Sequence, residues 1–335
     1  MKRFFLCILL LLALTVCITS CGGDQAPEGS PSETERTTVS ETDAASPETE
    51  ETAAEAVTEA ETTTEETTAE ETTAEETTAE ETTAEETTAE ETTAEEVTTA
   101  PAIFVTIASY NIKHGQDVDY DWSKLAELIL QSGADVVGLQ EVDMGTNRIE
   151  GRDTLAGLSE ACGYPYYYFT SAMDFDGGQY GTAILSRYPL SDTATISLPS
   201  PGGEEPRAFG VATVMLPNGA TLRLLNTHLS YEDLFVQSVQ FTQISKWIRK
   251  NVPEGMPVVI TGDFNTADFT AFKKLVELNF SLVNNEEHSY PTFRGSNTPI
   301  DNIVYRTAHL TPMEHGYIDS DRSDHNLLWC RFEVR

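Results

Sequence analysis

Residues 136–143 read VVGLQEVD, an apolar run that ends in an amide and two carboxylates. Because residues 136–139 are apolar on both faces, they predict a strand buried inside a sheet. Gln140 and Glu141 then stand where that strand ends. We therefore predict that a buried strand carries the Glu141 carboxylate to the rim of a sheet, where it meets groups from other strands.

The same arrangement, a polar side chain at the end of an apolar segment, recurs along the chain. Predicted strands with polar side chains at one end lie at residues 103–110, 221–227, 258–261, 302–305 and 327–332. Because strand ends crowd together at one edge of a sheet, we expect these ends to share a rim. The side chains delivered to that rim are Asn111, Glu141, His228, Asp263, Asn265, Asp301, Asp324 and His325.

Each of these rim residues, taken alone, has a purely structural explanation. Asn111 fits a turn, His228 fits a hydrogen-bonded core histidine, and Asp263 fits a loop cap. The repetition of one placement at six strand ends favours a shared site over eight independent structural roles.

The remaining pattern predicts helices and strands in irregular alternation. A further strand is predicted at residues 180–186, and a Pro-Asn-Gly turn at 217–219 predicts a hairpin between 209–216 and 221–227. Apolar residues at helical spacing predict helices at residues 122–131, 154–162, 232–250 and 269–278. The embedded hairpin favours an α/β fold in which two sheets pack face to face, with helices outside, over a doubly wound sheet.

The residue types at the predicted rim support a narrow range of chemistry. Carboxylate and amide oxygens are hard ligands, suited to Mg²⁺, Mn²⁺ or Ca²⁺. Histidines without cysteine partners fit acid, base or oxyanion roles better than a structural zinc site. A hard cation beside imidazoles indicates metal-assisted hydrolysis of a phosphate ester.

Seven short motifs give residues 103–333 a clear resemblance to the endonuclease/exonuclease/phosphatase superfamily. This group includes pancreatic-type deoxyribonucleases, abasic-site endonucleases, bacterial sphingomyelinases and inositol polyphosphate 5-phosphatases. The resemblance implies a four-layer α/β sandwich, with two packed mixed β-sheets flanked by helices. The motifs are YNI at 110–112, LQEVD at 139–143, YGTAILSR at 180–187, NTHL at 226–229, GDFN at 262–265, ID at 300–301 and SDH at 323–325.

The resemblance also implies a role for each rim residue. Glu141 resembles the main metal ligand, assisted by Asn111 and approached by Asp324. His325 resembles the general base that activates water, oriented by Asp301. The other three resemble groups that bind the scissile phosphate or position the nucleophile, namely His228, Asn265 and Asp263. The implied reaction is in-line attack by water, with Mg²⁺, or Mn²⁺ or Ca²⁺, as cofactor.

Further basic and aromatic residues stand near the motifs. Arg207 resembles a family arginine near the phosphate, although a surface salt bridge is an equally good explanation. Arg148 and the pair Lys113-His114 adjoin motif residues, where they either contact substrate or remain solvated at the rim. The tyrosine run at 164–168 favours strand packing over a platform on which bases stack.

The first residues have the pattern of an export signal. Lys2 and Arg3 precede an apolar stretch at 4–18, and residues 18–21 read ITSC. These residues resemble a bacterial lipoprotein cleavage site, so we expect a signal peptide at 1–20 and lipidation of Cys21. Cys17 fits less well because bulky Val16 precedes it, and an uncleaved anchor helix is the alternative. We expect the protein at the extracellular face of the bacterial cell membrane.

Residues 21–101 predict a disordered tether that begins at the lipidated cysteine. Residues 65–94 are six copies of EETTA, and residues 22–100 carry 26 acidic side chains against one basic side chain. So few apolar side chains cannot offset the entropy of ordering. Residues 102–335 then form the catalytic domain. The alternative is a surface adhesin whose acidic tract binds cations or a partner.

The substrate is the least determined feature. Residues 101–335 carry 29 acidic and 17 basic side chains, a net charge of −12 without a basic run, which disfavours long nucleic acid. We expect a lipid headgroup or small phosphoester in preference to DNA, with a DNase-like nuclease as the alternative. A catalytically inactive binding module is the rival from another class. We expect a monomer, and pairing of Cys162 with Cys330 stays open.

Overall fold

The computed structural model describes residues 102–335. The predicted signal peptide, the lipidation site Cys21 and the tether lie outside these residues. Within residues 102–335, no helix is both long and apolar enough to cross a membrane.

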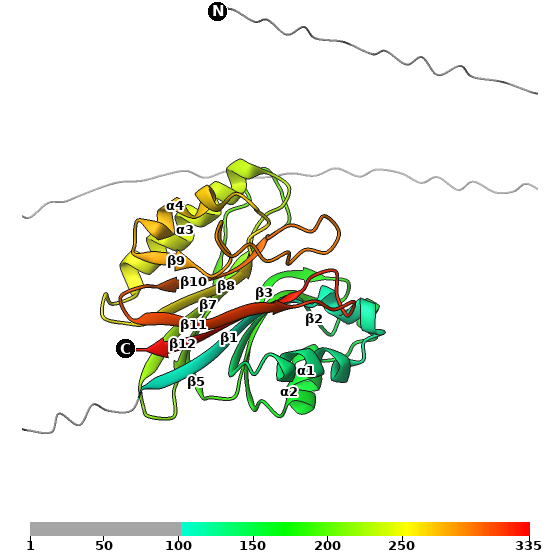
Figure 1. Cartoon of the computed structure of the whole chain (residues 1–335). Coiled ribbons are helices and arrows are strands. Elements are labelled where there is room, and N and C mark those ends of the chain that lie inside the picture. The colour runs from blue at the N-terminus through cyan, green and yellow to red at the C-terminus, as the bar shows by residue number, and fades with distance from the viewer. Residues whose placement is uncertain (1–101) are drawn as a thin grey trace, which may run out of the picture. The chain divides into compact units, whose positions relative to one another are not determined.

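Two six-stranded mixed sheets form the centre of the described domain (Figure 1). The first sheet has, in spatial order, β11 (Leu310–Ile318), β12 (Leu327–Val334), β1 (Ile103–Asn111), β2 (Val136–Met144), β4 (Gly178–Ser186) and β3 (Tyr166–Phe175). The second has β5 (Leu190–Ser197), β6 (Ala208–Met215), β7 (Thr221–His228), β8 (Val258–Asp263), β10 (Asp301–Arg306) and β9 (Phe280–Leu282).

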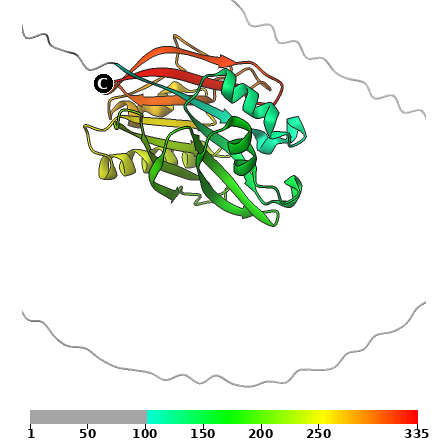
Figure 2. The same cartoon turned by 90° about the horizontal axis from the view of Figure 1, so that it is seen from below.

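Helices cover the outer faces of both sheets. Helices α1 (Trp122–Gln131) and α2 (Thr154–Cys162) lie on the first sheet, and α3 (Leu234–Asn251) and α4 (Lys273–Val276) lie on the second (Figure 1). In the view from below, α3 (yellow) and α1 (cyan to green) again lie on opposite sides of the strands (Figure 2). This arrangement confirms the predicted four-layer α/β sandwich.

Three apolar clusters fill the three spaces between the four layers. Alternate residues of one strand serve different clusters, because successive side chains point to opposite faces of a sheet. In β1, Ile107 packs between the sheets, whereas Ala108 and Tyr110 pack under α1 and α2. The third cluster joins the second sheet to α3 through residues such as Phe241 and Ile260.

The four strands at the sheet edges have the least distinct hydrophobic patterns in the sequence. The central strands were predicted from buried apolar runs, whereas β3, β5, β9 and β11 are largely half-buried or exposed. Only the tyrosine run hinted at β3. The reason is physical, since an edge strand needs fewer apolar side chains.

The predicted helix at 269–278 is shorter and less regular than expected. A 3₁₀ turn at Phe269–Phe272 leads into the single turn of α4. Two further 3₁₀ segments occur at Lys113–Val118 and Asn147–Ile149, just after β1 and β2. Within residues 102–335, Cys162 and Cys330 are separate, buried free thiols and do not pair with each other.

Candidate active site

The eight predicted site residues gather at one end of the two sheets. A cavity of about 350 Å³ opens there, and it is lined by Glu141, His228, Asp263, Asn265, Asp324 and His325 together with other residues. Asn111 and Asp301 lie behind this lining and hydrogen-bond to it. The sequence predicted that these eight residues share one site, and the structure places all eight at this end of the sheets.

Strand register explains why residues far apart in the sequence meet here. Asp263 is the cross-strand partner of His228 in the parallel β7–β8 pair. The same Asp263 is the partner of Asp301 in the antiparallel β8–β10 pair. Three functional groups are thus brought side by side by backbone pairing alone.

Asp263 is the hub of the polar network. Its Oδ1 accepts a hydrogen bond of 2.9 Å from the Asn265 backbone N–H. Its Oδ2 accepts one of 3.1 Å from Asn111 Nδ2 and lies 3.6 Å from His325 Nε2. Burial, and then the neighbouring Asp301 carboxylate, raise the pKa of Asp263 to about 7. This carboxyl group can therefore hold a proton near neutral pH.

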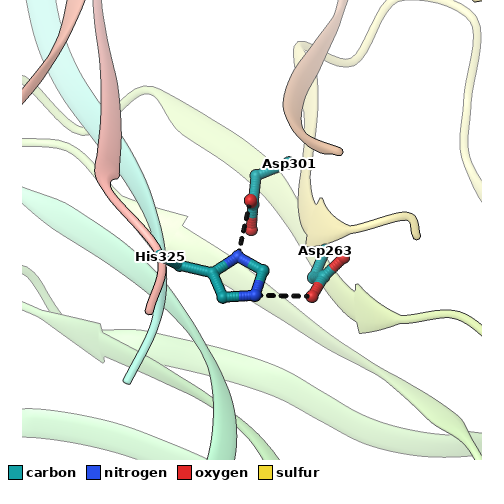
Figure 3. A group of neighbouring side chains, drawn as sticks. All are labelled: Asp263, Asp301 and His325. Carbon is teal, nitrogen blue, oxygen red and sulfur yellow. Dashed lines mark hydrogen bonds and ion pairs between the residues drawn. The ribbon is translucent and has the colours of Figure 1, made fainter. Parts of the chain in front are cut away.

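His325 lies between two carboxylates (Figure 3). Its Nδ1 is 2.8 Å from Asp301 Oδ2, and its Nε2 faces Asp263. Burial lowers the pKa of His325, but the Asp301 and Asp263 carboxylates outweigh burial and raise it to about 10. The Asp301 contact also fixes the ring orientation, so Nε2 is the nitrogen turned toward the other site groups.

His228 has the opposite electrostatic setting. Complete burial, and then the positive charges of Arg207 and His325, hold the pKa of His228 well below its usual value. Its Nε2 is 3.4 Å from Asp263 Oδ2, a distance at which a protonated ring would form an ion pair. Because desolvation and two nearby cations oppose protonation, the contact is that of a neutral imidazole. The two site histidines therefore differ in charge.

Glu141 is placed by an irregularity in β2. The pairing of β2 with β4 shifts between Leu139 and Val142, which is the mark of a β-bulge. Glu141 has a φ of 54° there, a left-handed conformation that is uncommon for a residue with a side chain. Burial raises the pKa of its carboxyl group, although the Asn111 hydrogen bond opposes this. Such strain is typical of functional positions.

Asn265 also has a left-handed backbone, with a φ of 52°. Its Nδ2 donates to the Leu229 carbonyl oxygen at 2.9 Å, and its own carbonyl oxygen accepts from Gln237 Nε2 of α3. These bonds hold the side chain at the cavity in one orientation. Both strained residues of the GDFN and LQEVD motifs therefore line the same cavity.

Arg207 is buried beside the cavity, which excludes the solvated surface salt bridge considered above. Its Nη1 is 3.1 Å from Glu205 Oε1, and its guanidinium lies 6.0 Å from the Tyr231 ring. Its Nε has no hydrogen-bond partner among the described residues. Arg207 therefore has a free donor next to the cavity, where an anion would satisfy it.

The family model for the "Endonuclease/Exonuclease/phosphatase family" matches residues 108–325. This span covers the second sheet, most of the first sheet and every residue of the cluster. The chain belongs to this family. An uncharacterized protein, YbhP, of Escherichia coli (strain K12) is 26% identical over 150 residues, which are 42% of this chain and 58% of YbhP. The matched region thus spans little more than half the length of that curated relative.

Solved structures share the fold at low sequence identity. An endonuclease/exonuclease/phosphatase from Beutenbergia cavernae DSM 12333 has a TM-score of 0.60 and 21% identity, covering 69% of this chain and 72% of that one. A mannosyl-6-phosphatase from Bacteroides thetaiotaomicron VPI-5482 has a TM-score of 0.54 and 19% identity, covering 69% and 99%. D. rerio TDP2 complexed with single-strand DNA product has a TM-score of 0.53 and 22% identity, covering 69% and 99%.

Two groups of residues in this family member offer ligands to a divalent cation. Asp263, Asp301 and His325 each have a ligand atom within 4.8 Å of the others. Both nitrogens of His325 already face carboxylates, however, which is the arrangement of a proton-sharing network. The better fit is Glu141 with Asp324, because both carboxylates line the cavity and hard oxygen donors suit Mg²⁺.

Asn111 supports this second group indirectly. Its Oδ1 accepts from the Lys113 backbone N–H at 3.1 Å, so Nδ2 is the atom that faces Glu141 Oε1 at 3.0 Å. An amide nitrogen cannot bind a cation. In this orientation Asn111 holds Glu141 in place, and direct ligation would require the amide to turn over.

The other residues singled out in the sequence have mixed positions. Lys113 pairs with Asp117 and lies 3.6 Å from Asp324. His114 is buried and is absent from the lining of the cavity. Arg148 lines a neighbouring cavity of its own. Among the tyrosines, Tyr168 bonds across to Thr195 of β5, as expected for strand packing.

Sequence reasoning missed several lining residues. Tyr180 and Tyr231 line the cavity, although Tyr180 opens the YGTAILSR motif and Tyr231 follows His228 by three positions. The first turn of α3 is only partly buried. Val236 is buried, but Leu234 and Phe235 are 78% and 69% exposed, because Asp233 caps α3 and turns the first helical residues outward.

Proposed function

We propose that this chain is a divalent-metal-dependent hydrolase of phosphate esters, a phosphodiesterase or phosphomonoesterase that acts by in-line attack of water. The observation that carries the proposal is the meeting of one neutral and one positively charged histidine, a buried carboxylate hub and the Glu141 carboxylate in one cavity. Membership of the family supports the same reaction class.

The contacts between the site residues support a separate role for each of them. In its neutral form, which a divalent cation at Glu141 and Asp324 would favour, His325 is held by Asp301 and accepts the proton of the incoming water at Nε2, while Asp263 positions that water. Because His325 Nε2 lies 3.6 Å from Asp263 Oδ2, the charge of each group shifts the pKa of the other. Neutral His228 and Asn265 hydrogen-bond to the phosphate, and Arg207 balances its charge.

Glu141 and Asp324 are the proposed metal ligands, with Asn111 orienting Glu141. A divalent cation bound there would offset the negative charge of the phosphate oxygens and would lower the pKa of adjacent groups. Mg²⁺ is the first expectation, with Mn²⁺ or Ca²⁺ as the alternatives.

A substrate panel tests the proposal. Plasmid DNA, sphingomyelin, inositol phosphates and bis-p-nitrophenyl phosphate are each assayed with Mg²⁺, Mn²⁺ or Ca²⁺. We expect hydrolysis of a lipid or small ester in preference to DNA, and His325→Ala should lower turnover by roughly 10²–10⁴-fold. His288→Ala is the matched control, because His288 is an exposed histidine outside the cavity. Equal activity of both variants would refute the role of His325.

The rival functions have distinct outcomes in the same experiments. Hydrolysis of DNA alone would favour a nuclease, and binding without any hydrolysis would favour an inactive binding module. Deletion of residues 22–100 separates an enzyme from an adhesin. The enzyme should keep its turnover on a soluble substrate, whereas an adhesin would lose its binding.

We further propose that lipidation at Cys21 anchors the enzyme, as a monomer, to the extracellular face of the cell membrane. The export signal and the ITSC sequence at 18–21 support this proposal. Cys21→Ala should release the protein from the membrane fraction, and Cys17→Ala is the matched control. Retention of the Cys21 variant with the membrane would contradict lipidation at that residue.

A further inference from the structure

A second, smaller cavity opens beside the catalytic one. Its volume is about 110 Å³. Its lining residues are Glu141, Arg148, Met173, Phe175, Tyr180 and Glu205. Glu141, Tyr180 and Glu205 also line the catalytic cavity, so the two spaces share a wall. A group attached to a phosphate in the first cavity and directed past Glu141 would enter the second.

Arg148 is held rigidly in the wall of this second cavity. Its Nε and Nη2 donate to the two oxygens of Asp143 at 2.5 and 2.7 Å. Asp143 is completely buried and accepts a further hydrogen bond from Thr146. The guanidinium lies 4.7 Å from the Phe175 ring centroid. Such a bidentate and stacked arginine loses little further entropy when it binds a ligand.

The charge on this wall is unfavourable for a second anion. The positive charge of Arg148 is matched by Asp143, and that of Arg207 is matched by Glu205. Glu141 adds another carboxylate to the shared wall. A second phosphate, or the backbone of a nucleic acid, would therefore find no unbalanced positive charge in this cavity.

The wall instead offers fixed hydrogen-bonding atoms. Among the described residues, Arg148 Nη1 has no hydrogen-bond partner, so an arginine donor remains free. Glu205 Oε1 is buried without a hydrogen bond, because its 3.1 Å contact with Arg207 is an ion pair without hydrogen-bond geometry. A free donor and a free acceptor in a pocket without excess positive charge match hydroxyl groups, which donate and accept at once.

We propose that this second cavity binds a neutral, hydroxyl-rich alcohol esterified to the scissile phosphate, such as a sugar or cyclitol, with Arg148 as the specificity-determining residue. This inference rests on the proposed phosphate ester hydrolysis and narrows its substrate class. An acyl chain would leave Arg148 Nη1 and Glu205 Oε1 without hydrogen bonds, and a polar site discriminates strongly against a ligand that lacks the matching groups.

The test compares two kinds of phosphomonoester with Mg²⁺ present. Hexose and cyclitol monophosphates carry the hydroxyl groups, and phenyl phosphate lacks them. The measured quantity is kcat/KM for the best polyol ester divided by kcat/KM for phenyl phosphate. Arg148→Lys keeps a positive charge opposite Asp143 but loses the fork of donors. It should lower this ratio about 10- to 100-fold and leave phenyl phosphate hydrolysis within about twofold.

Two further variants complete the design. Arg152→Lys is the matched control, since Arg152 is an exposed arginine on the same segment that pairs only with Glu150 among carboxylates of the described residues. Phe175→Leu leaves the Arg148–Asp143 pair intact and removes the stacking ring, so it should lower the ratio several-fold. This variant keeps the test valid if Arg148→Lys does not fold.

The possible failures are distinguishable. Absence of hydrolysis of every ester would refute the proposed function itself. Hydrolysis of phenyl phosphate with a ratio that neither Arg148→Lys nor Phe175→Leu changes would refute only the polyol site. Preference for DNA or for sphingomyelin over every polyol ester would also overturn the inference.

Discussion

Replacement of Asn226 by alanine should destabilise the fold more than any ordinary surface change. Asn226 lies near the end of β7 in the second sheet, and its Nδ2 donates to the Leu139 and Ala183 carbonyl oxygens of the first sheet, both at 2.8 Å. Its Oδ1 accepts from Gln140 Nε2 at 2.7 Å and from Thr261 Oγ1 at 3.0 Å. One completely buried amide therefore joins the two sheets behind the active site.

The magnitude follows from these four bonds. Each intramolecular hydrogen bond contributes about 1 kcal/mol net, so their loss should lower the free energy of unfolding by about 4 kcal/mol. Gln140 and Thr261 each have another acceptor nearby, whereas the truncation leaves space where the amide was. For a domain of this size, about 4 kcal/mol corresponds to a Tm lower by roughly 8–16 °C.

Differential scanning calorimetry of the purified protein measures the effect. Asn218→Ala is the matched control, because Asn218 lies in the exposed turn before β7 and accepts one bond from the Ala220 backbone N–H. The control should change stability by no more than about 0.5 kcal/mol. If Asn226→Ala melted within about 2 °C of the control, the bridge between the sheets would not have the stabilising role that we assign to it.

Three further predictions concern charge and reactivity. In metal-free buffer with a chelator, the free energy of unfolding should fall as pH rises from 6.5 to about 10. The folded state raises the pKa of His325, so the protonated ring stabilises the fold, and this stabilisation is lost when the ring deprotonates. Urea titrations should show a flatter pH profile of stability for His325→Gln, and an equally steep profile would contradict this. Arg207→Met should raise KM for a phosphate ester roughly 10- to 100-fold while Arg207→Lys restores part of the affinity, and unchanged KM in both would exclude a phosphate contact. Burial raises the pKa of Cys162 to about 12, so iodoacetamide at pH 8 should label this thiol in the native protein far more slowly than in urea, as mass spectrometry of the labelled peptide would reveal.

The membership of the site was predictable because it depends on local patterns. A buried central strand must be apolar along its length, so the polar residue at its end stands out in the sequence. Glu141 after VVGLQ and Asp263 after VVITG are the clearest examples. Strand ends also meet at one edge by geometry, which is why eight residues could be placed together without coordinates.

The charges of the site residues were not predictable in this way. His228 and His325 are the same residue type, and both follow polar motif residues. Their pKa values move in opposite directions because burial, and then Arg207 and His325, lower the pKa of His228, whereas two carboxylates outweigh burial at His325. These neighbours come from strands far apart in the sequence.

Gly138, in the stretch at residues 136–143, shows that close packing between the sheets was not predictable from the sequence either. Gly138 interrupts an apolar run for no local reason. A Cβ at this position would lie 2.0 Å from Thr261 Oγ1 and 2.5 Å from Asn226 Oδ1, so only glycine lets the sheets approach and the amide bridge form. The second cavity likewise exists only because Arg148, Phe175 and Glu205 converge from separate segments.

The sequence by itself determined which segments are buried strands, which polar residues end them and, through the motifs, which family fold they build. Those properties depend on side-chain periodicity, which is written in the order of neighbouring residues. The tertiary structure alone decided the protonation of each histidine, the atom that Asn111 turns toward Glu141, and the shape of the space beside the site. Electrostatic and packing energies depend on distances in space, and strand pairing sets those distances between residues that the chain keeps far apart.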